Sequence, residues 1–136
     1  MTSTRIAVVG AGYIGRAHIA AARQSEICSL SAIVDPVPAT QPLAADLGVP
    51  LYGTIEELLA KDRPDGVIIA TPNHLHVPHA LQCIAAGLPM LLEKPIAPTV
   101  PEAEALVRAA DEAGARTLIG HHRAHSPIMA KACEVI

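Results

Sequence analysis

Residues 10–15 read Gly-Ala-Gly-Tyr-Ile-Gly and directly follow the apolar run 5–9. Between a strand and a helix, this spacing builds a phosphate cradle. Gly10 allows the tight turn, Gly12 lets the backbone approach a pyrophosphate, and Gly15 lets the helix pack on the strand. The N–H groups and positive dipole end of that helix then face the anion. The segment predicts a dinucleotide site with these cofactor contacts: Gly10, Gly12, Tyr13, Ile14 and Gly15.

Asp35 is the acidic residue that such a site needs for the ribose. It ends the apolar run 30–34 and lies 20 residues beyond Gly15. A carboxylate at this distance accepts hydrogen bonds from ribose hydroxyls and repels a 2′-phosphate. Residues 36–38 read Pro-Val-Pro and contain no Arg or Lys to bind that phosphate, so we predict NAD rather than NADP. The alternative is an ordinary strand–helix turn with an ordinary loop carboxylate.

A second polar segment, Thr71-Pro72-Asn73, follows the buried β-branched run 67–70. Pro72 disfavours helix at Thr71, so the segment begins as a turn. At the end of a parallel strand, Thr71 and Asn73 can donate or accept hydrogen bonds with the nicotinamide half of a cofactor. The alternative is that both side chains only cap the helix that follows.

A third polar segment, Glu93-Lys94-Pro95, follows the apolar residues 90–92. Ligands bind at the carboxyl ends of parallel strands, where Lys94 can hold a substrate hydroxyl or carbonyl and stabilise charge on its oxygen. Pro95 fixes the turn and is a candidate for a cis peptide bond. The residue types alone leave an equal alternative, a surface ion pair of little energetic weight.

The elements that must position these residues alternate between strand and helix along the whole chain. This alternation implies an α/β fold with one parallel sheet, helices on both faces and the doubly wound (Rossmann) strand order 3-2-1-4-5-6. In that order the glycine turn and Thr71 face the same crevice. The expected strands are 5–9, 30–34, 51–52, 67–70, 90–92 and 116–119, and the expected helices are 13–24, 43–47, 54–61, 75–86, 99–113 and 127–135.

Composition excludes several classes of protein. The 136 residues suffice for one domain, and 51% hydrophobic residues with 17% charged residues exclude disorder. Mean hydropathy is +0.36, but the apolar stretches 66–70 and 83–92 are too short or too broken to span a membrane. There is no signal-peptide pattern, so we expect a cytoplasmic protein. A net charge of −3 and 1% aromatic residues argue against a nucleic-acid partner.

Cysteine and histidine positions indicate neither a disulfide framework nor a metal site. The three cysteines, Cys28, Cys83 and Cys133, are widely spaced and odd in number, which is typical of reduced thiols. Histidines cluster within 74–79 and 121–125, but neither cluster contains a Cys, Asp or Glu that completes a known ligand spacing. We therefore predict no bound metal.

Together these segments resemble a known family. The glycine turn 10–15, Asp35, Thr71-Pro72-Asn73, His76, Ala86-Gly87 and Glu93-Lys94-Pro95 occur in order with suitable spacings. They resemble the N-terminal domain of the glucose–fructose oxidoreductase / inositol 2-dehydrogenase / rhizopine catabolism (Gfo/Idh/MocA) family. The similarity extends over nearly the whole chain, to about residue 127, and the Glu-Lys-Pro segment makes it far more specific than the glycine turn alone.

The resemblance implies roles for individual residues. The domain would bind NAD or NADP, with Lys94 beside the nicotinamide as the catalytic residue that also contacts substrate. His76 and Glu93 would lie near the cofactor. Residues 121–127 match the family's connection out of the last strand, which makes His122 and Arg123 candidate substrate contacts. The full set of implied cofactor contacts after the glycine turn is Asp35, Thr71, Pro72, Asn73, His76, Glu93 and Lys94.

The resemblance also implies a function and its limits. Hydride would pass between nicotinamide and a secondary alcohol of a sugar or polyol, with a base supplied by a second domain. Residues 1–126 would form the dinucleotide-binding domain, and 127–136 would start the crossover to a substrate domain that this fragment lacks. We therefore expect cofactor binding without appreciable turnover. The apolar helix expected over 127–135 favours a homo-oligomer.

Two alternatives to a sugar or polyol dehydrogenase stay open. One is a non-catalytic regulator that senses a dinucleotide, and the other is an NAD-dependent glycosidase of the same family, in which the hydride returns to the substrate. The presence of Lys94 favours an enzyme, because a sensor needs no lysine beside the hydride site. The second domain would distinguish the dehydrogenase from the glycosidase.

Overall fold

The computed structural model describes residues 3–135 and contains one sheet of six parallel strands in the order β3-β2-β1-β4-β5-β6. This is the predicted doubly wound order. It places the carboxyl ends of β1 and β4 side by side at the point where the strand order reverses. The strands are β1 (Thr4–Val9), β2 (Cys28–Val34), β3 (Leu51–Tyr52), β4 (Gly66–Ile69), β5 (Met90–Leu92) and β6 (Thr117–Ile119).

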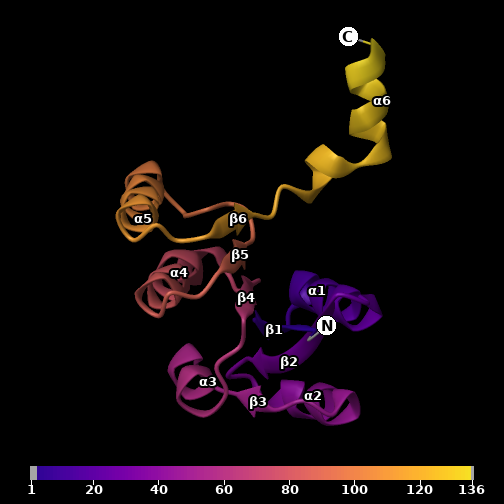
Figure 1. The fold of residues 1–136 in the computed structure, drawn as a ribbon, viewed down its shortest axis with the longest axis vertical. Coiled ribbons are helices and arrows are strands. Elements are labelled where there is room, and N and C mark those ends of the chain that lie inside the picture. The colour runs from indigo at the N-terminus through magenta and orange to yellow at the C-terminus, as the bar shows by residue number, and fades with distance from the viewer. Residues whose placement is uncertain (1–2, 136) are drawn as a thin grey trace.

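Helices cover both faces of the sheet (Figure 1). Helices α1 and α2 lie on one face, over β1 to β3, whereas α3, α4 and α5 lie on the other. This arrangement follows from right-handed crossovers on either side of β1. The helices are α1 (Tyr13–Gln24), α2 (Gln41–Leu47), α3 (Ile55–Lys61), α4 (His76–Ala85), α5 (Val100–Glu112) and α6 (Pro127–Val135).

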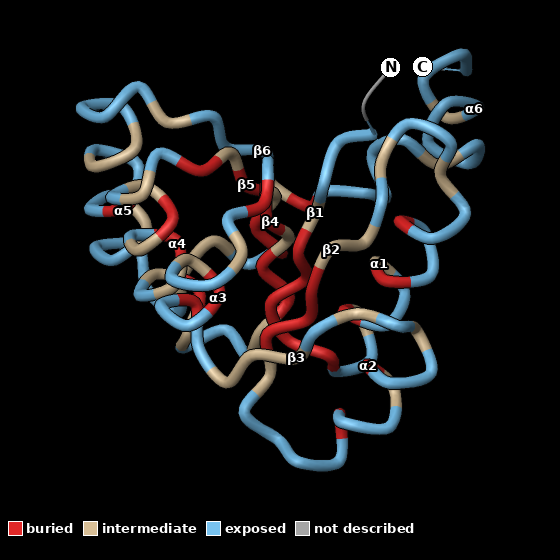
Figure 2. Tube along the Cα trace, turned by 60° about the horizontal axis from the view of Figure 1, so that its bottom comes forward, coloured by how far each residue is buried: buried red, intermediate tan, exposed pale blue. Residues whose placement is uncertain are grey.

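Two apolar cores lie on either side of the central strands, which are the most deeply buried part of the chain (Figure 2). On the α1 face, Ile19 packs with Val8 and Ile33. On the opposite face, Leu58 and Cys83 belong to a larger core with residues of β1, β4 and β5. Strands buried on both faces explain the continuous apolar runs in the sequence.

Two helices start at a Thr that is followed three residues later by a Glu. The hydroxyl of Thr54 accepts from the N–H of Glu57 (3.2 Å), and that of Thr99 accepts from the N–H of Glu102 (3.4 Å), so these threonines cap α3 and α5. Helix α4 starts one residue later than predicted, at His76, because a short 3-10 turn (Asn73–Leu75) precedes it.

Strand β2, in contrast, starts earlier than predicted, at Cys28 rather than residue 30. Its first residues pair with the start of β1, Thr4 with Cys28 and Ile6 with Leu30. The polar serines in this part of β2 weakened the apolar pattern, although the backbone pairing continues through them.

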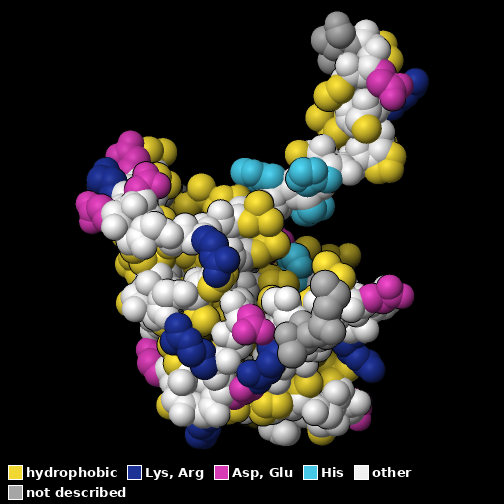
Figure 3. Space-filling model, in the orientation of Figure 1, with side chains coloured by type: hydrophobic (Ala, Val, Ile, Leu, Met, Phe, Trp, Pro, Cys, Tyr) yellow, Lys and Arg dark blue, Asp and Glu magenta, His cyan; other side chains and the backbone are white. Residues whose placement is uncertain are grey.

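Helix α6 extends away from the sheet and has no buried residue (Figures 1 and 3). Its apolar side chains are exposed, with Ile128 at 80% and Val135 at 76%. Histidine side chains gather where β6 leads into this helix (Figure 3). Within residues 3–135, no helix combines the length and hydropathy needed to cross a membrane.

Candidate functional site

The glycine turn brings β1, α1 and β4 into close contact. Gly10 has a φ of +92°, and a Cβ there would lie 2.7 Å from the carbonyl oxygen of Ala70. A Cβ at Gly15 would lie only 1.9 Å from the carbonyl oxygen of Gly10. Both positions therefore require glycine for close packing, and Gly10 requires it for its backbone conformation as well.

Gly12 is different, because a Cβ there would meet nothing within 4 Å. It is the N-cap of α1, with φ −67° and ψ −167°, and no side chain caps the helix. The first N–H groups of α1 are thus left for another acceptor, beside an open space in front of the backbone. This combination fits an anionic group such as a pyrophosphate.

Asp35 is fixed at the edge of the same space. Its Oδ2 accepts from the N–H of Ala11 (2.7 Å), and its Oδ1 accepts from the N–H of Val37 (2.9 Å). The carboxylate therefore connects the glycine turn to the loop after β2. Its remaining lone pairs can accept from ribose hydroxyls, as the sequence predicts.

A pocket of about 640 Å³ opens at the carboxyl ends of β1, β2 and β4. Five of the predicted cofactor contacts line it: Gly10, Gly12, Asp35, Thr71 and Pro72. Residues from the start of α3 and from the first two turns of α4, which the sequence analysis did not single out, also line the pocket: Thr54, Ile55, Glu56, Leu75, His79 and Gln82. In the sequence, only the spacing of Leu75 and His79, four residues or about one helical turn apart, indicated that two of these residues share a helix face.

His79 contributes a neutral polar group to this pocket. Its Nδ1 lies 3.3 Å from the hydroxyl of Thr71, a hydrogen bond whose direction depends on the tautomer of the ring. Burial, the main cause, lowers the pKa of His79, with His76 adding to this effect and Glu56 opposing it. The ring therefore favours its uncharged form.

Neither Thr71 nor Asn73 caps α4, since neither the helix nor the preceding turn has a side-chain cap. The alternative role suggested for them is therefore wrong. Asn73 lies exposed in the 3-10 turn, and Tyr13 is 94% exposed beside the glycine turn. Tyr13, Ile14, Gly15 and Asn73 adjoin the pocket in the chain but do not line it.

His76 lies behind the pocket wall rather than in it, with 1% of its surface exposed. Its Nδ1 is 2.6 Å from the carbonyl oxygen of Pro95, and its Nε2 is 2.9 Å from that of Thr71. Carbonyl oxygens only accept, so the ring can donate to both when it carries a proton on each nitrogen. His76 thus joins the loop after β4 to the loop after β5.

Glu93 is also buried, with 4% exposure. Its Oε1 accepts from Nε2 of His18 on α1 (2.8 Å), and its Oε2 accepts from the N–H of Lys94 (3.3 Å). Burial alone would raise the pKa of Glu93, but the hydrogen bonds from His18 and Lys94 and the charges of both outweigh burial and lower it. The carboxylate is therefore ionised, and its position beside Gly120 leaves no room for a Cβ there.

The three predicted substrate contacts come together in a separate hollow. Lys94, His122 and Arg123 line a space of about 290 Å³ with Gly120 and Met129. The peptide bond between Lys94 and Pro95 is cis, as the sequence analysis suggested. In this structure Lys94 does not line the dinucleotide pocket, although both lie at the carboxyl ends of the strands.

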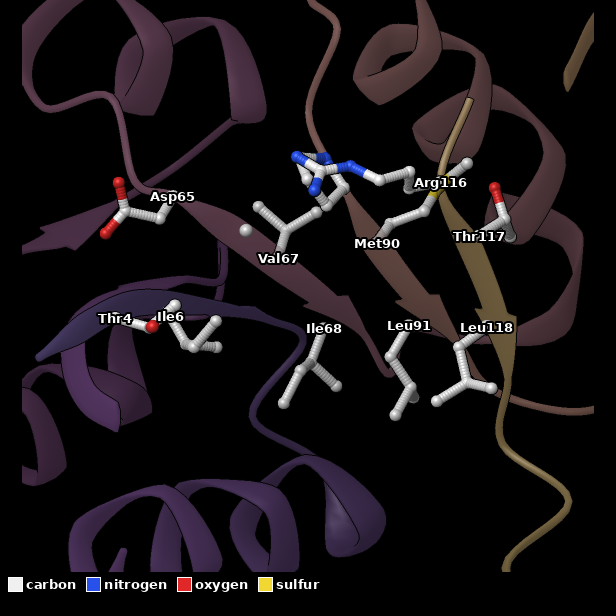
Figure 4. A pocket seen from close by; sticks show the side chains of 12 residues that line it. Thr4, Ile6, Asp65, Val67, Ile68, Met90, Leu91, Arg116, Thr117 and Leu118 are labelled. Atoms are coloured by element: carbon white, nitrogen blue, oxygen red, sulfur yellow. The ribbon is translucent and has the colours of Figure 1, made fainter. Parts of the chain in front are cut away.

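A hollow of about 730 Å³ lies elsewhere. Ile6, Ile68, Leu91 and Leu118 project from one face of β1 and β4 to β6, and Asp65 and Arg116 lie near the strand starts (Figure 4). This surface is open and mainly apolar, and it contains none of the predicted site residues. The candidate ligand site is therefore the pocket at the glycine turn, where polar groups and an open helix terminus converge.

Comparison with known proteins agrees with this geometry. Residues 4–121 match a family model described as oxidoreductase family, NAD-binding Rossmann fold (Gfo/Idh/MocA). The chain belongs to this family. The resemblance noted from the sequence is thereby confirmed, and the chain is an NAD-binding Rossmann domain.

Three relatives illustrate the match. The chain is 35% identical to the rhizopine catabolism protein MocA of Rhizobium meliloti over 127 residues, which cover 93% of this chain and 40% of that protein. It is 38% identical to inositol 2-dehydrogenase of Corynebacterium glutamicum over 99 residues, covering 71% of this chain and 29% of that enzyme. The crystal structure of the WlbA dehydrogenase from Bordetella pertussis, in complex with NADH and UDP-GlcNAcA, is 31% identical with a TM-score of 0.85, covering 90% and 36% of the two chains. The chain thus spans at most about two fifths of these relatives' lengths.

Among residues 3–135, no group of three or more His, Cys, Asp or Glu side chains is arranged to hold a metal ion. Cys83 is buried and Cys133 exposed, and the cysteines are free thiols.

Proposed function

We propose that this chain binds NAD in the 640 Å³ pocket and supplies Lys94 to a sugar or polyol dehydrogenase. The observation that carries the proposal is the contrast within the glycine turn. Backbone atoms occupy the space that a side chain at Gly10 or Gly15 would need, whereas Gly12 faces open space at an uncapped helix terminus. A pyrophosphate fits that space, and the N–H groups of α1 would bind it.

The remaining contacts follow from the pocket wall. Asp35 would accept hydrogen bonds from the ribose hydroxyls, because its two oxygens face the pocket edge and retain free lone pairs. Thr71 and Pro72 would lie along the cofactor where β4 ends. The bound cofactor would supply the hydride acceptor, and the chain would orient it.

Asp35 also supports NAD over NADP. A 2′-phosphate would bring a second negative charge against a carboxylate that backbone N–H groups hold in place. The neighbouring pocket residues Pro36 and Val37 have no positive charge to offset the repulsion.

Lys94 would bind the oxygen of the substrate carbon. Its ammonium group can stabilise the negative charge that develops on this oxygen as the hydroxyl proton leaves. His122 and Arg123 share its hollow and would contact other hydroxyls of the substrate. The relatives named above include an inositol 2-dehydrogenase, which supports a polyol or sugar as the substrate class.

Turnover would require residues beyond this domain. The chain spans about 40% of MocA. Besides Lys94, the groups lining the hollow that could accept the hydroxyl proton are His121 and His122, which lie exposed in the connection after β6. We propose that the 136 residues bind cofactor in the cytoplasm without nucleic acid. We also propose that they self-associate through the exposed apolar residues of α6, which solution scattering would detect.

Calorimetric titration of the 136-residue chain with NAD and with NADP tests the cofactor proposal. We expect saturable binding of NAD and weaker binding of NADP. Absence of NAD binding to a chain that unfolds cooperatively would refute the site. In parallel, production of NADH from NAD and inositol by this chain alone would refute the need for further residues.

A further inference from the structure

Lys94 is flanked by two residues that are each bonded to a histidine from a different helix. On one side, the carboxylate of Glu93 accepts from His18. On the other side, the carbonyl oxygen of Pro95 lies 2.6 Å from a ring nitrogen of His76. The sequence analysis gave no role to His18 and placed His76 at the cofactor, so this pairing emerges only from the structure.

The bond between His18 and Glu93 crosses from α1 to the end of β5. The Nε2–O distance is 2.8 Å, and the side chain of Glu93 is 5% exposed while that of His18 is 21% exposed. An ionised carboxylate accepts only, so Nε2 of His18 carries the proton of this bond. A buried carboxylate without such a donor would be costly, which fixes the conformation of Glu93.

His76 contacts the same segment from the helices on the other face of the sheet. The ring belongs to the first turn of α4, and its two nitrogens reach the carbonyl oxygens of Pro95 and Thr71. Thr71 lines the dinucleotide pocket, whereas Pro95 directly follows Lys94. His76 therefore ties the pocket wall to the segment that carries the lysine.

Helices α1 and α4 lie on opposite faces of the sheet (Figure 1), so the two histidines hold the segment from both sides. We propose that His18 and His76 are positioning residues that together clamp residues 93–95 and fix the backbone of Lys94 relative to the dinucleotide pocket. The value of this clamp for catalysis rests on the function proposed above for Lys94, but the clamp itself is a property of the cofactor-free chain.

Amide hydrogen exchange of the 136-residue chain, followed by NMR, tests the clamp. The reporter is the N–H of Lys94, which donates to Glu93 at 3.3 Å. Replacing His18 by Leu removes the donor that orients this carboxylate, and replacing His76 by Leu frees the carbonyl of Pro95. We expect each variant to accelerate exchange at Lys94 by up to about tenfold, as expected for loss of one hydrogen bond.

Two reference amides separate local loosening from general instability. The N–H of Ile33 donates to Pro50 (3.0 Å) and that of Val67 donates to Pro89 (3.0 Å), both away from the clamp. Under the proposal, amide exchange accelerates by a larger factor at Lys94 than at Ile33 and Val67. Equal acceleration at all three sites would overturn the proposal, because the histidines would then only stabilise the domain.

Conservative and control variants complete the test. His18→Gln retains an N–H donor for Glu93, so it should restore slow exchange at Lys94 relative to His18→Leu. Arg23→Gln changes an exposed residue on the same helix and should leave exchange at Lys94 unchanged. Failure of His18→Gln to restore slow exchange would overturn the hydrogen-bond explanation. None of these readouts requires NAD, so a failed clamp and a failed cofactor site give different results.

Discussion

Replacing Gly12 by alanine adds a methyl group on the open side of the glycine turn. The backbone there has φ −67°, which alanine adopts freely, and the new Cβ would meet no atom within 4 Å. We therefore expect the free energy of unfolding to stay within about 0.5 kcal/mol of the wild type. The methyl group would, however, occupy the space we assign to the pyrophosphate, and NAD affinity should fall at least about tenfold, or about 1.4 kcal/mol.

Gly15→Ala is the matched comparison, three residues further along the same turn. Its Cβ would lie 1.9 Å from the carbonyl oxygen of Gly10, where ordinary contact begins at 3.4 Å. Helix α1 would have to move away from β1 by more than an ångström. Overpacking of this kind costs about 3 kcal/mol or more, so Gly15→Ala should unfold at a markedly lower urea concentration.

Urea denaturation measures the stability of both variants, and quenching or enhancement of NADH fluorescence measures cofactor binding. We expect Gly12→Ala to keep its stability and to bind NADH weakly, and we expect Gly15→Ala to lose stability. Unchanged NADH affinity in Gly12→Ala would refute the pyrophosphate site. A large loss of stability in Gly12→Ala would instead refute the open geometry of the turn.

Three further predictions concern single side chains. Asp35→Ala should weaken NAD binding more than NADP binding in calorimetric titrations, and equal losses would contradict the ribose assignment. Burial raises the pKa of Cys83 to about 12, so at pH 8 iodoacetamide should label Cys133 and leave Cys83 unmodified until the chain unfolds. Because the pKa of Glu93 is lowered on folding, its contribution to stability is present above its unfolded pKa and lost as the pH falls through its folded pKa. Glu93→Gln should therefore make the urea midpoint vary less with pH in the acidic range. An unchanged pH profile would show that Glu93 is not ionised in the folded chain.

Features encoded by local patterns were predictable from the sequence. The strand order followed from alternating strands and helices, and the helices 54–61 and 99–113 were expected where Thr54 and Thr99 in fact cap α3 and α5. Gly10 and Asp35 were identified because a phosphate turn and its acidic partner have a characteristic separation. These patterns depend on neighbours in the chain, so they need no knowledge of the tertiary packing.

Features created by packing between distant elements were not predictable. His18 lies 75 residues from Glu93, and nothing in a lone histidine on an amphipathic helix points to a carboxylate on another element. Glu56 and His79 reach the pocket only because α3 and α4 begin at the same sheet edge. The sequence placed His76 at the cofactor, whereas its burial behind the wall depends on carbonyl groups whose positions the chain order does not specify.

The two backbone bonds of Asp35 have a consequence for how cofactor preference can change. A carboxylate offers about four acceptor sites, and the N–H groups of Ala11 and Val37 use two of them. The two that remain match the two hydroxyls of one ribose, and the side chain has already lost its rotational freedom before any ligand arrives. Any substitution that admits a 2′-phosphate would also remove a bond that shapes the glycine turn. Altering the preference therefore calls for a second change that gives the N–H of Ala11 a new acceptor.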